Sequence, residues 1–275
     1  MSTIKQHPSV QMDFCLLNSR SIKNKVDALK DYTVDHDLDI FALTETWLTD
    51  CDNFSIGELC PTGYYFHHVS RKNSKGGGVG LLLKKRIQIK KQTEEKYRSF
   101  EYVDVIAKCS NGCIRIVNIY RPPPSKSNSL NSSIFFHEFS TLAEQLVLTP
   151  GNLLIVGDFN YHVDVSTNSD ATRFSNVIKF FNMRQHVIGP THKHGHTLDL
   201  ILTRSNDDLV TRVETKDPML SDYLAVHFKL SLKKPPPVQT KIQYRKLRSI
   251  NINNNNNNNK ISIAHIHYCS MRFTL

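Results

Sequence analysis

Two polar side chains with catalytic potential end the segment LLIVGDFN, residues 153–160. An apolar run of four residues stops at Gly157, and Asp158 and Asn160 follow two positions apart. Because side chains alternate along a strand, a strand through this segment directs both polar groups to the same side. A carboxylate and an amide in that position suit a site for a metal ion and a phosphate. A simple turn is the competing interpretation, so the rest of the chain must supply matching groups.

Polar residues also end other predicted strands. The strand over residues 13–18 ends at Asn18, and the strand over residues 39–44 is followed by Glu45. Apolar residues at helical spacing lie between them, and strand, helix, strand is typical of an α/β fold, in which such strand ends are neighbours. Three further groups lie at or near predicted strand ends: Tyr120, Asp199 and Asp222.

Asp199 is a carboxylate inside the otherwise apolar strand predicted over residues 197–203. An unpaired charge is costly in such a place, so Asp199 needs a cation, a histidine or another donor. His192, His194 and His196 alternate just before it, but without a further ligand cluster we do not interpret them as a zinc site.

The elements that must position these groups alternate between strands and helices. Further strands are predicted over residues 64–69, 78–83, 102–109, 113–120 and 223–230. Asn111 and Gly112 form a preferred hairpin turn pair between two of them. Two amphipathic helices are expected, one from Ser132 or Ser133 and one capped by Asp170.

The net charge of +10 is concentrated in two segments. Residues 71–98 contain ten Lys or Arg and two Asp or Glu, and residues 232–275 contain eight Lys or Arg and no Asp or Glu. A solvated face and a contact surface for a phosphate backbone are both open interpretations of the first segment.

The domain organisation expected from composition is a single folded domain with two flanking segments. We expect a disordered N-terminus over residues 1–12, a folded domain over residues 13–232, and a basic, Pro- and Asn-rich disordered tail over residues 233–275. No apolar run is long enough for a membrane span, and no signal peptide is recognisable. The six cysteines have no disulfide-framework spacing. We therefore expect an intracellular protein of the nucleus or cytoplasm.

Seven strings, in order, resemble the endonuclease/exonuclease/phosphatase superfamily and more narrowly the endonuclease domain of a non-LTR retrotransposon polyprotein. They are LLNSRSI, LTETWL, GGGVGLL, NIYRPP, IVGDFN, GHTLDLILT and LSDYLAVHF, within residues 13–231. The resemblance implies a deoxyribonuclease-like four-layer α/β sandwich, in which two facing mixed β-sheets are flanked by helices. It also implies an active site at one edge of the sheets.

The resemblance further implies a role for each matching residue. Glu45, with Asn18 and Asp222, would hold Mg²⁺, with Mn²⁺ as an alternative. Asp158 would orient or deprotonate the attacking water, while Asn160 and Tyr120 would hydrogen-bond the phosphate. The expected partner is DNA, with no membrane, bound by a monomer that lacks the reverse-transcriptase portion of the family polyprotein. The residues expected to contact nucleic acid are Lys72, Lys75, Lys84, Lys85, Arg86 and Arg121.

One position departs from the family pattern. The family has Ser-Asp-His where this chain has Ser221, Asp222 and Tyr223, and that histidine pairs with the aspartate found here at Asp199. A tyrosine is a neutral donor without the positive charge of an imidazolium. We therefore expect a DNA endonuclease whose cleavage is impaired. The alternatives are a non-catalytic nucleic-acid-binding module and, less favoured by the strings, a phosphatase of phosphorylated lipids or sugars.

Overall fold

A computed structural model describes residues 10–71, 76–92, 96–125, 128–232, 240–243 and 268–271. It divides into two compact units, residues 1–233 and residues 234–275. The first unit contains both large sheets and the four helices of the described chain. In the second unit, the described residues form a two-stranded antiparallel sheet of β13 (Thr240–Gln243) and β14 (Tyr268–Met271). The expectation of a disordered tail otherwise lies outside the described residues, as does that for residues 1–9.

The first six-stranded sheet of the described chain has the order β11-β12-β1-β2-β4-β3. Its strands are β1 (Val10–Asn18), β2 (Ile40–Thr44), β3 (Tyr64–Val69), β4 (Val79–Lys84), β11 (Val210–Lys216) and β12 (Ala225–Leu232). Only β1 and β2 are parallel to each other, so Asn18 lies beside Thr44 at the same end of the sheet. The two edges of this sheet are antiparallel.

The second six-stranded sheet has the order β5-β6-β7-β8-β10-β9. Its strands are β5 (Gln88–Lys91), β6 (Glu101–Cys109), β7 (Gly112–Tyr120), β8 (Asn152–Asp158), β9 (Met183–Gln185) and β10 (Asp199–Arg204). Here too one pair is parallel, β7 with β8, and the others are antiparallel. The helix that connects this parallel pair is α3 (Ser132–Leu148), as a crossover between parallel strands requires.

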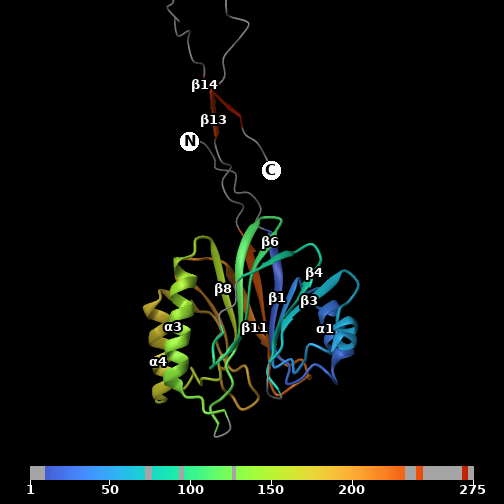
Figure 1. Cartoon of the computed structure of the whole chain (residues 1–275), viewed down its shortest axis with the longest axis vertical. Helices are drawn as coiled ribbons and strands as arrows, with labels where there is room; N and C mark the ends of the chain where they lie inside the picture. Colours follow the sequence, from blue (N-terminus) through green and yellow to red (C-terminus); the bar gives the residue numbers. More distant parts are fainter. Residues whose placement is uncertain are drawn as a thin grey trace, which may run out of the picture. The chain divides into compact units, whose positions relative to one another are not determined.

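The two sheets face each other, and helices cover their outer faces. Figure 1 shows α1 (Val26–Asp35) outside the first sheet, and α3 with α4 (Ser169–Phe180) outside the second. Three apolar clusters correspond to the three interfaces: one between the sheets, one under α3 and α4, and one under α1. This arrangement confirms the predicted four-layer α/β sandwich.

A buried amide ties the two sheets together close to their polar edge. Asn118 on β7 donates from Nδ2 to the carbonyl oxygens of Leu43, at 3.0 Å, and Gly80, at 3.1 Å. Both acceptors belong to the first sheet, next to the strand end that precedes Glu45. The separation of the two sheets is therefore fixed near the place where the predicted site residues converge.

The sequence predicted most elements but missed those with weak patterns. The edge strands β5, β9 and β11 and the short helix α2 (Asn53–Leu59) were not expected. Two of these strands are short, β11 is mostly exposed and polar, and α2 buries only Leu59, so none has a clear hydrophobic period.

Several boundaries also differ from the expected ones. Strand β1 begins at Val10, before the expected start at residue 13, and β12 begins at Ala225, after Tyr223. The cap of α4 is Asn168, whose Oδ1 accepts from the N–H groups of Asp170 and Ala171, and Asp170 lies in the first turn instead.

Candidate active site

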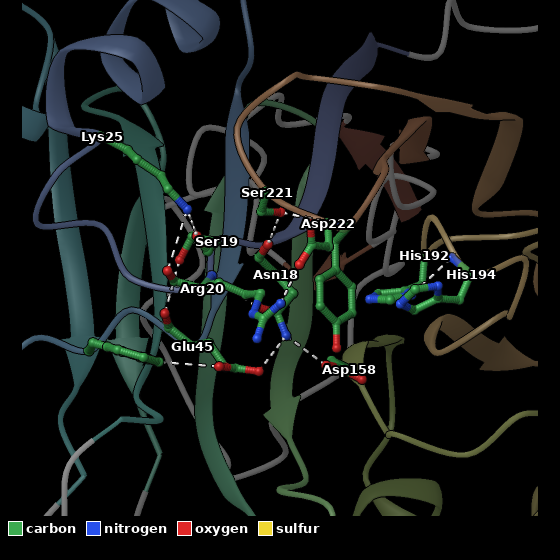
Figure 2. Close-up of polar contacts among 12 residues, drawn as sticks. Asn18, Ser19, Arg20, Lys25, Glu45, Asp158, His192, His194, Ser221 and Asp222 are labelled. Atoms are coloured by element: carbon green, nitrogen blue, oxygen red, sulfur yellow. Dashed lines mark hydrogen bonds and ion pairs between the residues drawn. The ribbon is translucent and has the colours of Figure 1, made fainter.

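The site is built around Asn18, the last residue of β1. Its side-chain amide donates to Glu45 Oε1 at 2.8 Å and to Asp158 Oδ2 at 2.7 Å, while its Oδ1 accepts from the Arg20 N–H at 3.0 Å. Figure 2 shows Asn18 between the two carboxylates. Glu45 follows β2 of the first sheet and Asp158 ends β8 of the second, so one amide joins the edges of both sheets.

Strand register brings two more predicted residues to this edge. Tyr120, the last residue of β7, is paired with Asp158 across the parallel ladder, and Asp199, the first residue of β10, is paired with Asp158 across the antiparallel ladder. Burial, followed by the charges of Glu45 and Asp158, raises the pKa of Tyr120 well above its usual 10, so its hydroxyl lies near both carboxylates. Glu45, Asp158 and Asp199 therefore converge, as the sequence interpretation required.

Gly157 allows the chain to deliver Asp158 at this point. Its φ of +145° lies outside the range that residues with a side chain adopt readily, and a Cβ there would collide with the backbone of Ile119 on β7. Close approach of β7 and β8 therefore requires glycine before the aspartate.

Asn160 reaches the site by a turn and not by strand alternation. Strand β8 ends at Asp158, and Asn160 has a φ of +50°. The Asn160 backbone N–H donates to Asp158 Oδ1 at 2.9 Å, and its Nδ2 donates to Asp158 Oδ2 at 3.2 Å and to the Arg121 carbonyl at 2.7 Å. The expected same-face geometry is thus corrected, because the turn folds the amide back onto Asp158. In this arrangement both hydrogens of Asn160 Nδ2 are donated to acceptors within the protein.

The paired aspartates are buried with little compensating charge. Burial raises the pKa of Asp158 from its usual 3.8 to about 7, the Asn18 hydrogen bond opposes that rise, and the charge of Glu45 adds to it. Burial and then the charge of Asp158 raise the pKa of Asp199 well above 3.8. Neither carboxylate oxygen of Asp199 has a partner at hydrogen-bond geometry among the described residues, although the Thr191 hydroxyl lies close enough to lower its pKa in part.

Tyr223 occupies the position of the family histidine without satisfying Asp199. It is almost fully buried, and its hydroxyl lies close enough to Asp158 to lower the pKa of that carboxyl in part. Burial and the charges of Asp158 and Asp199 raise the pKa of Tyr223 far above its usual 10, so it stays a neutral donor. His192 packs edge-on against the Tyr223 ring with ring centroids 4.7 Å apart, and the pKa of His192 is lowered by burial and by His194.

Asp222 and two cations form the rim of the site. Asp222 makes an ion pair with Arg20, and both side chains are half exposed. Lys25 donates from Nζ to the Ser19 carbonyl at 2.6 Å, and burial followed by the charge of Arg20 lowers the pKa of Lys25. Asp222 thus lies beside Asn18, Glu45 and Asp158, and its carboxylate is held by Arg20. The sequence interpretation missed Arg20 and Lys25, although both lie within seven residues of Asn18 in SRSIKNK.

Among the described residues, those expected to contact nucleic acid do not gather at this site. Lys84 forms ion pairs with Asp37 and Asp39, and Arg86 pairs with Asp39, at the opposite end of β2 from Glu45. Lys85 follows Lys84 at the same end, and Lys72 and Lys75 lie outside the described residues.

Arg121 has an internal position that does not fit a role in contacting DNA. It is only 3% exposed. Its guanidinium lies 3.9 Å from the Tyr161 ring centroid and donates to the carbonyl oxygens of Phe159 and Asn160, each at 3.2 Å. Arg121 therefore fixes the loop that carries Asn160.

The residues present fit a hard divalent cation. The described part of the chain has no cluster of three or more His, Cys, Asp or Glu side chains arranged as a complete metal cage. Mg²⁺ does not need one, because it binds proteins through one or two carboxylates and fills its other positions with water and substrate phosphate. Glu45 and Asp158 provide carboxylates at the site. The carboxylate oxygens of Asp199 have no hydrogen-bond partner among the described residues, so a cation would balance their negative charge when Asp199 is ionised.

Comparisons with known proteins identify relatives of this arrangement. The sequence profile described as "Endonuclease/Exonuclease/phosphatase family" matches residues 13–222. No curated protein sequence matches the chain.

Solved structures show the same fold at low sequence identity. The endonuclease domain of TRAS1, a telomere-specific non-LTR retrotransposon, has a TM-score of 0.65 and 14% identity, over 82% of this chain and 100% of that one. The AP endonuclease LMAP from Leishmania major has a TM-score of 0.61 and 12% identity, over 80% and 88%. A 3′ phosphatase from Neisseria bound to product DNA hairpin has a TM-score of 0.59 and 15% identity, over 80% and 99%. At these identities the likeness shows the fold alone.

Proposed function

Since this chain belongs to the endonuclease/exonuclease/phosphatase family, we propose that it is a metal-dependent DNA endonuclease domain of the retrotransposon type, impaired by Tyr223. The observation that carries the proposal is the single amide of Asn18 between Glu45 and Asp158, at the edge where both sheets end. The retrotransposon type is favoured by the strings around the site and by the likeness to the TRAS1 domain.

Each residue of the site has a task in phosphodiester hydrolysis. Glu45, with Asn18 and Asp222, would hold Mg²⁺ close to Asp158, and the ion when bound neutralises charge on the phosphate. Burial raises the pKa of Asp158, which favours its acceptance of a proton from the attacking water. Asn18 and Asn160 hold its carboxylate in place, and the Tyr120 hydroxyl lies on the Glu45 side of the site, next to where a phosphate would bind.

The impairment follows from the environment of Asp199. A histidine at position 223 would pair with the Asp199 carboxylate, which would stabilise the protonated imidazole. That imidazolium would present positive charge to the phosphate. The Tyr223 hydroxyl instead lies near Asp158, and neither Asp199 oxygen has a hydrogen-bond partner among the described residues. The site therefore lacks a cation at the place where charge develops during cleavage.

A nicking assay on supercoiled plasmid with Mg²⁺ tests the catalytic assignment. We expect slow nicking by the unmodified chain and a further loss of about a hundredfold or more for Glu45→Ala, because a carboxylate of the metal site is removed. Glu58→Ala, an exposed carboxylate on α2, is the matched control and should nick like the unmodified chain. Nicking that survives Glu45→Ala would refute the assignment.

The same assay tests the impairment. Tyr223→His should raise the nicking rate by roughly a hundredfold to ten-thousandfold, the usual contribution of a positioned acid or charge-stabilising group. Tyr223→Phe, which has no hydroxyl and no charge, should show no such rise. An unmodified chain that already nicks as fast as Tyr223→His would show that Tyr223 does not impair the site.

The second candidate function is a non-catalytic nucleic-acid-binding module, favoured by the concentration of positive charge outside the site. It predicts DNA binding that is sensitive to salt and unaffected by Glu45→Ala, with no Mg²⁺-dependent nicking. Phosphatase activity on a lipid or sugar phosphate is less favoured by the flanking strings. Release of phosphate from inositol phosphates would reveal it.

A further inference from the structure

The only tryptophan of the chain lies at the mouth of the candidate site. Trp47 follows Glu45 by two residues and is 43% exposed, whereas most large apolar side chains of this unit are buried. Its indole Nε1 donates to Glu45 Oε2 at 3.2 Å. An exposed aromatic ring is therefore held beside the carboxylate proposed to bind the metal.

The backbone is strained where it presents this ring. Glu45 and Trp47 both have a left-handed backbone, with φ of +50° and +54°. Residues with a side chain adopt this conformation rarely, and it persists where surrounding hydrogen bonds impose it. Here the N–H of Trp47 donates to the Gly77 carbonyl at 2.8 Å, and that of Thr46 donates to the Gly78 carbonyl at 3.2 Å.

The surroundings of the ring combine small residues and cations. The position that a Gly76 Cβ would take lies 3.6 Å from the indole, so a bare backbone borders the ring. The Arg71 guanidinium packs close to the same glycine loop and lies 5.7 Å from the centroid of the Tyr120 ring. Arg20 and Lys25 are on the rim beyond Glu45. Exposed aromatic rings among cations are the features with which proteins bind unpaired nucleotides.

We propose that Trp47 is a nucleobase platform, on which one unstacked base of the DNA strand lies next to the phosphate at Glu45. The inference rests on the proposed function only in requiring that a DNA strand passes Glu45. A fully stacked duplex does not offer a base face to such a ring, whereas a single strand or a locally melted step does. The platform therefore gives the site a preference for DNA that is single-stranded or unstacked at the cleaved position.

The fluorescence of the full chain tests the platform directly, because Trp47 is its sole tryptophan. With tryptophan excited selectively and a chelator present, so that no cleavage occurs, oligodeoxyadenylate should quench the emission. An oligomer of the same length and charge that consists of abasic nucleotides should bind the cations but leave the emission nearly unchanged. Equal quenching by both oligomers would overturn the proposal.

Affinities of variants separate stacking from the other contacts of the indole. Trp47→Ala should weaken binding of oligodeoxyadenylate by about 5- to 100-fold, the range expected for one stacked base. Trp47→Phe loses the N–H that contacts Glu45 but keeps a ring, so most of the affinity should remain. Phe180→Ala, an 81% exposed aromatic at the end of α4, is the matched control and should bind like the unmodified chain.

The outcomes distinguish this inference from the proposed function. Mg²⁺-dependent nicking with unchanged affinity in Trp47→Ala would refute the platform and leave the endonuclease assignment intact. Loss of affinity that is equal for a perfectly paired duplex and for the single strand would also refute it. Failure of the unmodified chain to bind any of these oligomers would refute both.

Discussion

At the residue scale, the carboxylates of the site differ in what balances their charge. Glu45 accepts hydrogen bonds from Asn18 and Trp47, and its charge helps to raise the pKa of Tyr120. Asp158 accepts from Asn18 and Asn160, yet its pKa is still raised to about 7. Asp199 lies against Asp158 with no partner at hydrogen-bond geometry in the described chain. The ionised site is thus intrinsically unfavourable, and this excess of negative charge favours a cation.

The cost of Asp199 should appear in the pH dependence of stability. Its pKa is higher in the folded chain than its usual 3.8, so the folded state binds more protons and the free energy of unfolding falls as pH rises above about 4. Asp199→Asn removes this ionisation, and its amide can donate to Asp158. We expect little change at pH 4 and a stabilisation of roughly 1–3 kcal/mol at alkaline pH.

Thermal unfolding of both chains across this pH range measures the difference. Asp199→Asn should also abolish the gain in nicking rate that Tyr223→His provides, since the imidazole would have no carboxylate partner. A variant that is less stable than the unmodified chain at alkaline pH would mean that Asp199 is already well paired.

At the element scale, the site depends on parallel strand pairs whose ends meet. Strands β1 and β2 bring Asn18 and Glu45 to one end of the first sheet, and β7 and β8 bring Tyr120 and Asp158 to the matching end of the second. The turns beyond these ends then set the directions of the side chains, as the turn of Asn160 onto Asp158 illustrates. Small changes in strand spacing should therefore disrupt the whole constellation.

Gly157→Ala tests this dependence. The new Cβ would meet the Ile119 backbone at a φ of +145°, so β7 and β8 would have to separate. We expect a loss of roughly 2–5 kcal/mol in the free energy of unfolding, from overpacking and backbone strain together. Chemical denaturation provides the measurement.

Gly57→Ala in α2 is the control for that substitution. A Cβ there meets nothing within 4 Å, and the site is helical, so the change should stabilise by about 0.4–1 kcal/mol. If Gly157→Ala is as well tolerated as Gly57→Ala, close strand approach is not what requires the glycine.

At the scale of the whole molecule, the candidate site and much of the positive charge belong to different units. The site lies in the unit of residues 1–233, whereas residues 234–275 contain seven Lys or Arg and no Asp or Glu. None of the helices in the described residues is long and apolar enough to cross a membrane.

A chain that ends at Lys233 tests this division. It should unfold at the same temperature as the full chain and keep its Mg²⁺-dependent nicking at low salt. If the basic segment contacts DNA phosphates, the slope of log affinity against log salt should become less negative by up to roughly 6 after truncation. An unchanged slope would assign DNA binding to the first unit alone, and a lower unfolding temperature would show that the two units are coupled.

The sequence by itself indicated the alternation of strands and helices in this protein and the identity of the polar residues at its strand ends. Alternating apolar runs and amphipathic helices predicted an α/β fold, because burial imposes period and order on the chain, and the family resemblance of the strings implied the four-layer sandwich. Weak edges such as β5 and β11 were missed, since little of their surface is buried.

Only the tertiary structure decided which partners those residues contact and which of them are buried. It turned the Asn18 amide to two carboxylates, buried Arg121, left the Asp199 carboxylate without a hydrogen-bond partner in the described part of the chain, and placed Trp47 at the mouth of the site. These outcomes depend on contacts between residues far apart in the chain, as Asn18 and Asp158 are. Local periodicity reports which side of an element is buried, and it contains no information about which distant group will meet it.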